Sequence, residues 1–388
     1  MIYQKKKLFA ILLLVAVCAG CGAEKEQTTM VTVDIATEHS EKEVVLQDFM
    51  DVEYIPLETS DEFVTQGSVM DIGDKYLLVK NWANDGDIFV YDRKTGKAIR
   101  KINRKGQGAE EYNFISGIIL DENNDEMFVN CAAAKIYVYD LSGNFKRSFA
   151  HPKDTEYMDV LNYDKDNLIC YDASVYYKDG QSREEGKSYH SLISKKDGSV
   201  TRDIYLPYDI IKTPCVHQGD GVAMTSVRPI IPNRGEWLLV DCSSDTVYNY
   251  VPEKNKLVPF FVKAPTKDPE ILLTMGAVTD RYYFLHTVKK EFDFTTGRGF
   301  FMNDFMYDKQ TNELYKAKVL NSDFVKKRSV DMFLHPINNN GIAAVQTLSA
   351  GQLVEAYQED GLKGRLKEVA AGLDEESNPV VMLVKYKN

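Results

Sequence analysis

One strand–turn–strand pattern recurs along this chain at nearly regular spacing. Two of its copies, IFVYDRKTGK and IYVYDLSGNF, begin at Ile88 and Ile136. Turns of the same kind are centred on Gly96, Gly143, Gly198, Asn255 and Asn312, at intervals of 47 to 57 residues. Glycine and asparagine are the residues that best tolerate a positive φ. We therefore expect a left-handed backbone at all five positions and one structural unit around each.

The spacing of these units indicates a propeller. Short runs of β-branched and aromatic residues flank every turn, with about four such runs per repeat, and helical periodicity is nearly absent before residue 349. Four strands per repeat of this length is typical of a propeller blade. Five turns together with the terminal strands predict six blades. The sequence thus predicts an all-β fold, a six-bladed antiparallel β-propeller.

The ends of the repeat array predict how the ring closes. VEYIPL at 52–57 precedes the first full unit and VMLVKY at 381–386 follows the last, so we expect these strands to share one sheet and leave no open edge. Residues 46–388 then form a single domain. Elongated hairpin loops at 179–186 and 289–298 interrupt the repeat. The one clear helical stretch is an insertion at about 350–373, where apolar residues recur every three or four positions and Gly361 and Gly364 divide the helix.

The N-terminus carries an export signal. Residues 1–20 contain three lysines followed by an apolar run that is too short to span a bilayer stably. Ala19 and Gly20 before Cys21 resemble a lipobox, which predicts a lipoprotein signal peptide and acylation of Cys21. An ordinary cleaved signal peptide and an uncleaved anchor are the alternatives. Residues 21–45 are expected to form a polar tether between the lipid and the domain.

Charge and cysteine usage narrow the class of protein. The formal net charge is −11, which argues against binding of nucleic-acid backbones by counterion release. The cysteines beyond the signal region are Cys131, Cys170, Cys215 and Cys242, none in a CxxC pair. An exported protein permits disulfides, and buried free thiols explain these residues equally well.

Several segments resemble a known family. VEYIPLET (52–59), RKGQGAEEY (104–112) and NPVVMLVKYK (378–387) are similar to segments of exported six-bladed β-propeller lipoproteins of unknown function, related in architecture to NHL-type and TolB-like propellers. The chain departs from them at Ala109 and Glu110, where the family usually has Pro-Gly. The resemblance implies a propeller fold, lipid anchoring and a place in the cell envelope. It implies no catalytic residue set, and it associates such proteins with polymer or peptide uptake.

Two motifs that resemble ligand sites have simpler explanations. The glycine-rich loop at 104–112 could cradle a phosphate only at a strand-to-helix junction, and a strand follows it here. We expect a crossover between blades anchored by Tyr112, with ligand contact as the alternative. The acidic run 121–126 lacks the glycine and the twelfth-position carboxylate of an EF-hand, so it reads as a solvated turn.

The ligand-binding candidates are residues that a propeller would bring to one face or to its axis. Histidines on successive units can converge there, and exposed aromatic rings beside polar groups suit sugars or peptides. The candidates are His217, Arg228, His286, His335, Trp82 and Tyr176. The alternatives are that each of the three histidines has its own separate structural partner, and that the aromatic rings pack between blades. No zinc-hydrolase motif is present, and we expect neither a metal nor a cofactor.

The sequence therefore favours a lipid-anchored protein of the cell envelope, on the outer membrane, whose propeller face binds an extracellular ligand. The expected partners are a glycan, a peptide or an envelope protein of an uptake system, and nucleic acid is not among them. The alternatives are a lyase or hydrolase that uses axial histidines and carboxylates, or a scaffold of an envelope complex. This reasoning rests on fold and location rather than on a recognised site.

Overall fold

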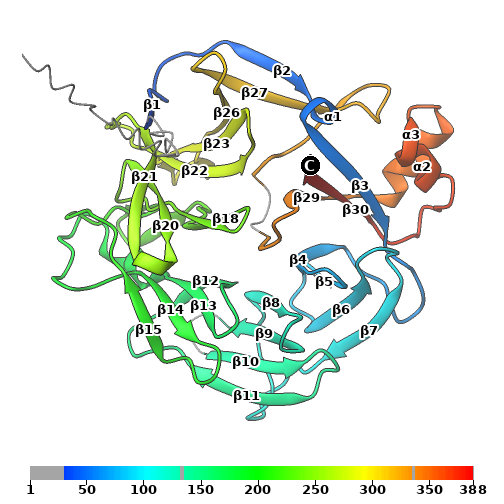
Figure 1. The fold of residues 1–388 in the computed structure, drawn as a ribbon, viewed down its shortest axis with the longest axis horizontal. Coiled ribbons are helices and arrows are strands. Elements are labelled where there is room, and N and C mark those ends of the chain that lie inside the picture. The colour runs from blue at the N-terminus through cyan, green and yellow to red at the C-terminus, as the bar shows by residue number, and fades with distance from the viewer. Residues whose placement is uncertain (1–29, 132–134, 334–336, 388) are drawn as a thin grey trace, which may run out of the picture.

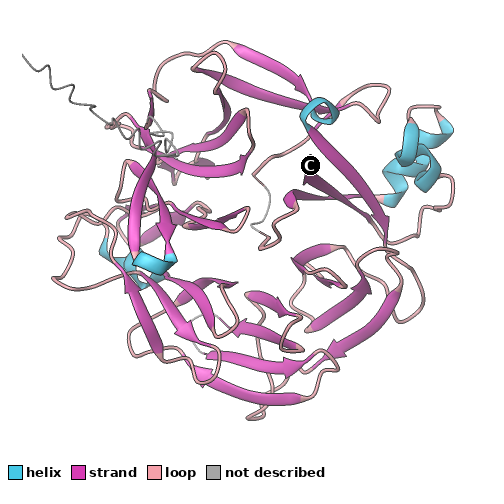
Figure 2. Cartoon of the chain, viewed as in Figure 1, coloured by secondary structure: helices cyan, strands magenta, loops and turns pink. Residues whose placement is uncertain are grey.

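Six sheets surround a central axis in the computed structural model, which describes residues 30–131, 135–333 and 337–387 (Figure 1). Strands make up nearly all of the ring, and the few helices lie at its margin (Figure 2). The predicted all-β, six-bladed antiparallel propeller is confirmed. The predicted signal peptide 1–20, Cys21 and His335 lie outside the described residues.

The first three blades are regular four-stranded antiparallel sheets, with the first strand of each next to the axis. Blade 1 contains β4 (Ser68–Ile72), β5 (Tyr76–Lys80), β6 (Asp87–Asp92) and β7 (Ala98–Asn103). Blade 2 contains β8 (Gly117–Asp121), β9 (Glu126–Cys131), β10 (Lys135–Asp140) and β11 (Phe145–Ala150). Blade 3 contains β12 (Tyr157–Asn162), β13 (Asn167–Asp172), β14 (His190–Ser194) and β15 (Val200–Ile204).

Blades 4 and 5 each gain one outer strand from the N-terminal part of the chain. Blade 4 contains β18 (Ile230–Asn233), β19 (Glu236–Leu239), β20 (Thr246–Val251) and β21 (Lys256–Lys263). Blade 5 contains β22 (Ile271–Val278), β23 (Tyr282–Lys289), β26 (Met302–Asp308) and β27 (Glu313–Asn321), with β28 (Arg328–Ser329) paired to β27. The added strands are β1 (Val31–Val33), parallel to β21, and β2 (Glu41–Val45), parallel to β27.

These added strands correct one expectation. A polar tether was predicted over residues 21–45, yet Val31–Val33 and Glu41–Val45 are hydrogen-bonded into the ring. In β1, Val31 and Val33 pack on the core of blades 4 and 5, where Val33 is buried. In β2, Val44 and Val45 are partly buried. Residues 31–33 and 41–45 therefore belong to the ring and not to a tether. We call residues 31–56, which run along blades 4, 5 and 6, the N-terminal belt.

Blade 6 closes the ring as predicted. It consists of β29 (Ile342–Leu348), β30 (Val380–Tyr386) and β3 (Met50–Pro56). β3 follows the short helix α1 (Leu46–Phe49) and pairs antiparallel with β30 from Met50↔Tyr386 to Pro56↔Val380. The helical insertion is also confirmed, as α2 (Ala350–Gln358) and α3 (Gly364–Ala370) between β29 and β30.

Among the described residues, blade 6 has three strands instead of four, and β29 is the one nearest the axis. Residues 338–341 lie at the end of the propeller where β4, β8 and β12 finish, so β29 starts there and runs opposite to those inner strands. Upstream of it, the Met332 carbonyl accepts a hydrogen bond from the Ala277 amide of β22 at 3.1 Å. In the described chain, blade 6 therefore differs at the axis from the other five blades.

The five predicted turn positions all adopt a left-handed backbone. The φ angles are +70° at Gly96, +85° at Gly143, +74° at Gly198, +44° at Asn255 and +57° at Asn312. Each turn joins the third strand of a blade to the fourth. A side chain with a branched β-carbon would be strained there, so the sequence repeat has the steric cause that was expected.

The glycine-rich loop at 104–112 is a crossover between blades 1 and 2, as predicted. Tyr112 is fully buried, and its hydroxyl donates to the Gly86 carbonyl at 2.7 Å and accepts from the Arg104 amide at 2.9 Å. The Tyr139 hydroxyl of blade 2 donates to the Glu110 carbonyl at 2.6 Å. The loop is therefore held by its own backbone and by the two blades that it joins.

Apolar side chains fill the space between neighbouring sheets. Blades 2 and 3 also share a buried ion pair, Lys195–Asp121, at 2.6 Å. The four cysteines are free thiols, and three of them are buried. Within the described ranges, no helix has both the length and the hydrophobicity needed to cross a membrane.

Ring closure predicts which apolar truncation is costly. Leu383 of β30 is fully buried between blades 6 and 1, so Leu383→Ala should lower the free energy of unfolding by about 2–5 kcal/mol. Ile99 on the outer strand β7 is 44% exposed, so Ile99→Ala is the matched control and should change the free energy of unfolding by no more than about 0.5 kcal/mol. Urea denaturation of both variants checks this, and equal midpoints would contradict the importance of closure.

Candidate functional site

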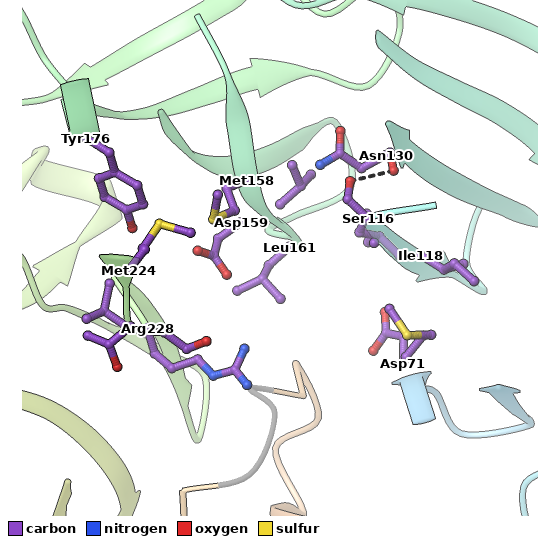
Figure 3. A pocket seen from close by; sticks show the side chains of 17 residues that line it. Asp71, Ser116, Ile118, Asn130, Met158, Asp159, Leu161, Tyr176, Met224 and Arg228 are labelled. Carbon is purple, nitrogen blue, oxygen red and sulfur yellow. Dashed lines mark hydrogen bonds between the residues drawn. The ribbon is translucent and has the colours of Figure 1, made fainter. Parts of the chain in front are cut away.

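A cavity of about 210 Å³ opens on the axis at the end of the propeller where β4, β8, β12, β18 and β22 begin, which we call the entry face. Its walls come from the inner strands of blades 1 to 3 and from the chain just before β18 (Figure 3). With Asn130 of β9 and Tyr176, six separate parts of the sequence thus meet around one small space. Because inner strands carry one face toward the axis, their axial side chains decide its chemistry.

Two opposite charges face this cavity. The Asp159 carboxylate on β12 points into it, and the Arg228 side chain, two residues before β18, extends toward the axis from the other side (Figure 3). Among the described residues, neither the Asp159 carboxylate nor the Arg228 guanidinium makes a hydrogen bond or an ion pair. Burial raises the pKa of Asp159 to about 6, although the Arg228 charge lowers it in part. Both groups are therefore available to a ligand.

Two hydroxyl groups and two methionines complete the wall at the entry face. Thr225 is only 5% exposed, and its Oγ1 has no hydrogen-bond partner. Tyr176 lies on the short helix η1 (Ala173–Lys178), and its pKa is raised by burial. Met158 and Met224 add flexible apolar surface that can adapt to different shapes. A buried hydroxyl without a partner costs about 1–3 kcal/mol, so a hydrogen bond from a ligand to Thr225 Oγ1 would be favourable.

Asp71 forms the floor of the cavity. Its carboxylate accepts hydrogen bonds from the Leu120 amide at 2.7 Å and the Ile72 amide at 2.9 Å. Burial raises its pKa to about 6 despite these bonds. Asp71 also borders a second cavity of about 680 Å³ at the opposite face, so it separates the two mouths of the axis.

The second cavity is polar, but its carboxylates already have structural roles. Glu122 accepts hydrogen bonds from the amides of Asp74, Lys75 and Tyr76, which fixes the turn between β4 and β5. Asp121 pairs with Lys195. The acidic run 121–126 contains the turn between β8 and β9, as predicted, but Asp121 and Glu126 at its ends are buried in ion pairs and not solvated. The candidate site is therefore the cavity at the entry face.

A further charged group lies on blade 5 beside Arg228. The His286 ring contacts the Asp304 carboxylate, with Nδ1 and Oδ1 2.7 Å apart, and packs against Phe333 with ring centroids 5.2 Å apart. Burial and the neighbouring Asp304 charge raise the pKa of Asp331, while His286 and Arg228 lower it. The entry face thus presents Arg228 among several carboxylates.

The structure brings together only part of the predicted set. Arg228 and Tyr176 line the same cavity. His286 stands on β23, outside the cavity lining. His217 is exposed on the hairpin of β16 (Cys215–Gln218) and β17 (Gly221–Met224), and Trp82 is 76% exposed on the loop between β5 and β6. His217 and His286 were predicted to meet at the axis, but neither lines this cavity.

Sequence reasoning missed the residues that give the cavity its chemistry. Asp159, Thr225, Met158 and Met224 were not among the candidates. Asp159 lies in YMDVLN, which has a weak strand pattern, and recognising 157–162 as the first strand of its repeat would have placed Asp159 near the axis. No group of three or more His, Cys, Asp or Glu side chains that could hold a metal ion occurs in the described parts of the chain.

Fold and site together define a six-bladed β-propeller with a charged cavity on its axis. Residues 23–343 match the family described as 6-bladed beta-propeller (DUF5128). This match covers more than half of the chain, so the protein belongs to that family. No curated protein matches the sequence.

Two solved structures are similar to the whole propeller. An exported protein from Bacteroides fragilis is 14% identical with a TM-score of 0.60, and the alignment covers 93% of this chain and 100% of that one. A member of the DUF4221 family from Bacteroides vulgatus is 10% identical with a TM-score of 0.50, covering 88% and 99%. At these identities the likeness establishes the shared fold.

The unpaired Asp159 carboxylate predicts a pH-dependent stability difference. Its pKa of about 6 in the folded chain exceeds the ordinary value of 3.8, so the folded state loses stability from this group as the pH rises through that interval. Asp159→Asn should therefore raise the Tm at pH 8 by about 1–3 °C, and the gain should vanish below pH 4.

Thermal unfolding of the ligand-free protein between pH 4 and pH 8 measures this difference. Asp51→Asn, at an exposed position on β3, is the matched control and should show no pH-dependent gain. A Tm of Asp159→Asn at or below that of the unaltered protein at pH 8 would show that the carboxylate is stabilised by the fold.

Proposed function

We propose that this protein is an exported, lipid-anchored propeller of the cell envelope that binds a small polar ligand in its axial cavity. The observation that carries the proposal is the pair of charged side chains, Asp159 and Arg228, which face the cavity without a protein partner among the described residues. Buried or half-buried charges are expensive unless they are paired. A ligand with complementary charges would offset that free-energy cost.

The shape of the site supports binding of a small molecule. Ligand sites are concave, mostly apolar and equipped with a few converging polar groups, and this cavity has methionine and leucine walls around Asp159, Arg228 and Thr225. The exposed Trp82 and the hairpin that carries His217 lie on the same entry face. These outer residues could contact a larger glycan or peptide, or an envelope partner of an uptake system.

Two observations support the proposed location. The first 21 residues have the pattern of a lipoprotein signal that ends at Cys21, and the similar structure from Bacteroides fragilis is described as an exported protein. The N-terminal belt begins at β1 on the rim of blade 4. The lipid would thus hold the propeller by its rim and leave the entry face accessible.

Blocking the cavity should abolish ligand binding. A Cβ at Gly117, which lines the cavity, would meet no heavy atom closer than 3.8 Å, so Gly117→Phe is sterically tolerated at its β-carbon and places a ring in the cavity. A thermal-shift and calorimetry screen of amino acids, short peptides, neutral sugars and uronic acids should find a compound that binds the unaltered protein and not this variant.

The control for this screen is Gly351→Phe on α2, far from the cavity lining, where the nearest heavy atom to a Cβ is 3.9 Å away. It should bind as the unaltered protein does. Equal affinity of Gly117→Phe and Gly351→Phe for every binder would move the binding site away from the axis.

Removing the acylated thiol should release the protein from the membrane. Cys21→Ser leaves no thiol for lipid attachment, and the chain should then be recovered in the soluble envelope fraction after export, whereas the unaltered protein should sediment with membranes. Immunoblots of the two fractions measure this, with Cys18→Ser as the control that should stay membrane-bound. Sedimentation of Cys21→Ser with membranes would contradict lipid anchoring at this residue.

A further inference from the structure

The two unpaired charges of the axial cavity restrict the charge of its ligand. Arg228 favours an anionic group, and its guanidinium suits a carboxylate in particular. Asp159 faces the same space and would repel a simple anion. A simple cation would pair with Asp159 but would be repelled by Arg228. Only a ligand that carries both an anionic and a cationic group pairs both side chains.

The remaining polar groups argue against a sugar as the deep ligand. Asp71 is occupied by two backbone amides. Asn130 donates to the Tyr157 carbonyl at 2.8 Å, and its amide oxygen lies 3.1 Å from Nε2 of His151. Ser116 donates to the Asn130 carbonyl at 2.8 Å. The hydroxyls left for a ligand are those of Thr225, Tyr176 and Ser226, and a sugar ring with several hydroxyl groups needs more partners than these.

The walls and size of the cavity fit an apolar side group. Met158, Leu161 and Met224 line it, and methionine adapts to irregular apolar shapes. The cavity volume of about 210 Å³ lies below the roughly 300–1,000 Å³ of pockets that take drug-sized ligands. That space suits a molecule of the size of a single amino acid.

We infer that the deep ligand of the axial cavity is an α-amino acid with an apolar side chain, bound through its carboxylate by Arg228 and through its ammonium group by Asp159. This inference rests on the proposed function and names the ligand class of the same site. Thr225 Oγ1 is placed to add a hydrogen bond, and the methionine wall receives the side chain.

Leucine and two of its derivatives test this assignment by calorimetry. Leucinamide keeps the ammonium group but has lost the anionic carboxylate, and N-acetylleucine keeps the carboxylate but has lost the ammonium group. Each derivative should bind about 10- to 100-fold more weakly than leucine, which is the range expected for one charge-assisted hydrogen-bonded pair.

Two variants assign each charge to its partner. Arg228→Met should weaken leucine binding and remove the difference between leucine and leucinamide. Asp159→Asn should remove the difference between leucine and N-acetylleucine. Arg365→Met, on the exposed helix α3, and Asp51→Asn are the matched controls and should keep both differences.

The outcomes separate this inference from the proposed function. Tighter binding of a uronic acid or neutral sugar than of leucine, blocked by Gly117→Phe, would overturn the amino-acid assignment and leave the ligand-binding function standing. Equal binding of leucine and both derivatives would also overturn the assignment. If no compound of the panel binds the unaltered protein, both proposals fail.

Discussion

The antiparallel pairing of β3 with β30 is the constraint on which the rest of this structure depends. It joins residues near the two ends of the described chain over the full length of both strands, from Met50↔Tyr386 to Pro56↔Val380. With four free cysteines and no disulfide in the described chain, the closure is held by backbone hydrogen bonds, by apolar packing and by the ion pair between Lys385 of β30 and Glu53 of β3 at 3.1 Å. The N-terminal belt extends this closure across blades 4 and 5, where β1 and β2 cover outer strands that would otherwise be open edges.

The geometry of the axial site depends on closure of the ring, because its lining residues come from several blades. Its charges come from blade 3 and from the chain before blade 4, and its floor comes from Asp71 of blade 1. None of these elements could hold Asp159 and Arg228 on opposite sides of one cavity unless the blades were fixed around a common axis. Truncation of the closing strand at Leu383 should therefore affect the site as well as stability.

The fold could be predicted from the sequence because its signals are local. Each of the five turn residues indicates the backbone conformation of its own turn, and the β-branched runs beside them indicate the neighbouring strands. The turn residues are Gly96, Gly143, Gly198, Asn255 and Asn312. The helical insertion and the closing strands were predictable for the same reason. The outer strands β1 and β2 were not, because three to five residues at an edge carry too little pattern to distinguish them from a tether.

The site depends on distances between blades, which no local pattern carries. Arg228 and Tyr176 were predicted as ligand candidates and do meet in the cavity, whereas His217 and Trp82 lie on exposed loops of the entry face. Asp159 escaped notice because it is one of 58 acidic residues and acquires its significance only from its place on an inner strand. Its physical signature is a raised pKa without a partner, and that signature exists only in the folded chain.

The placement of Asp159 opposite Arg228 in the cavity wall is also the strongest argument that the cavity has a function. A carboxylate in an apolar wall destabilises the folded state at neutral pH, and an amide or apolar side chain of similar size would relieve the strain of burial without changing the blade. The buried Thr225 hydroxyl adds a second unfavourable group within the same wall. Two such groups beside an unpaired guanidinium favour selection for a bound partner over selection for stability.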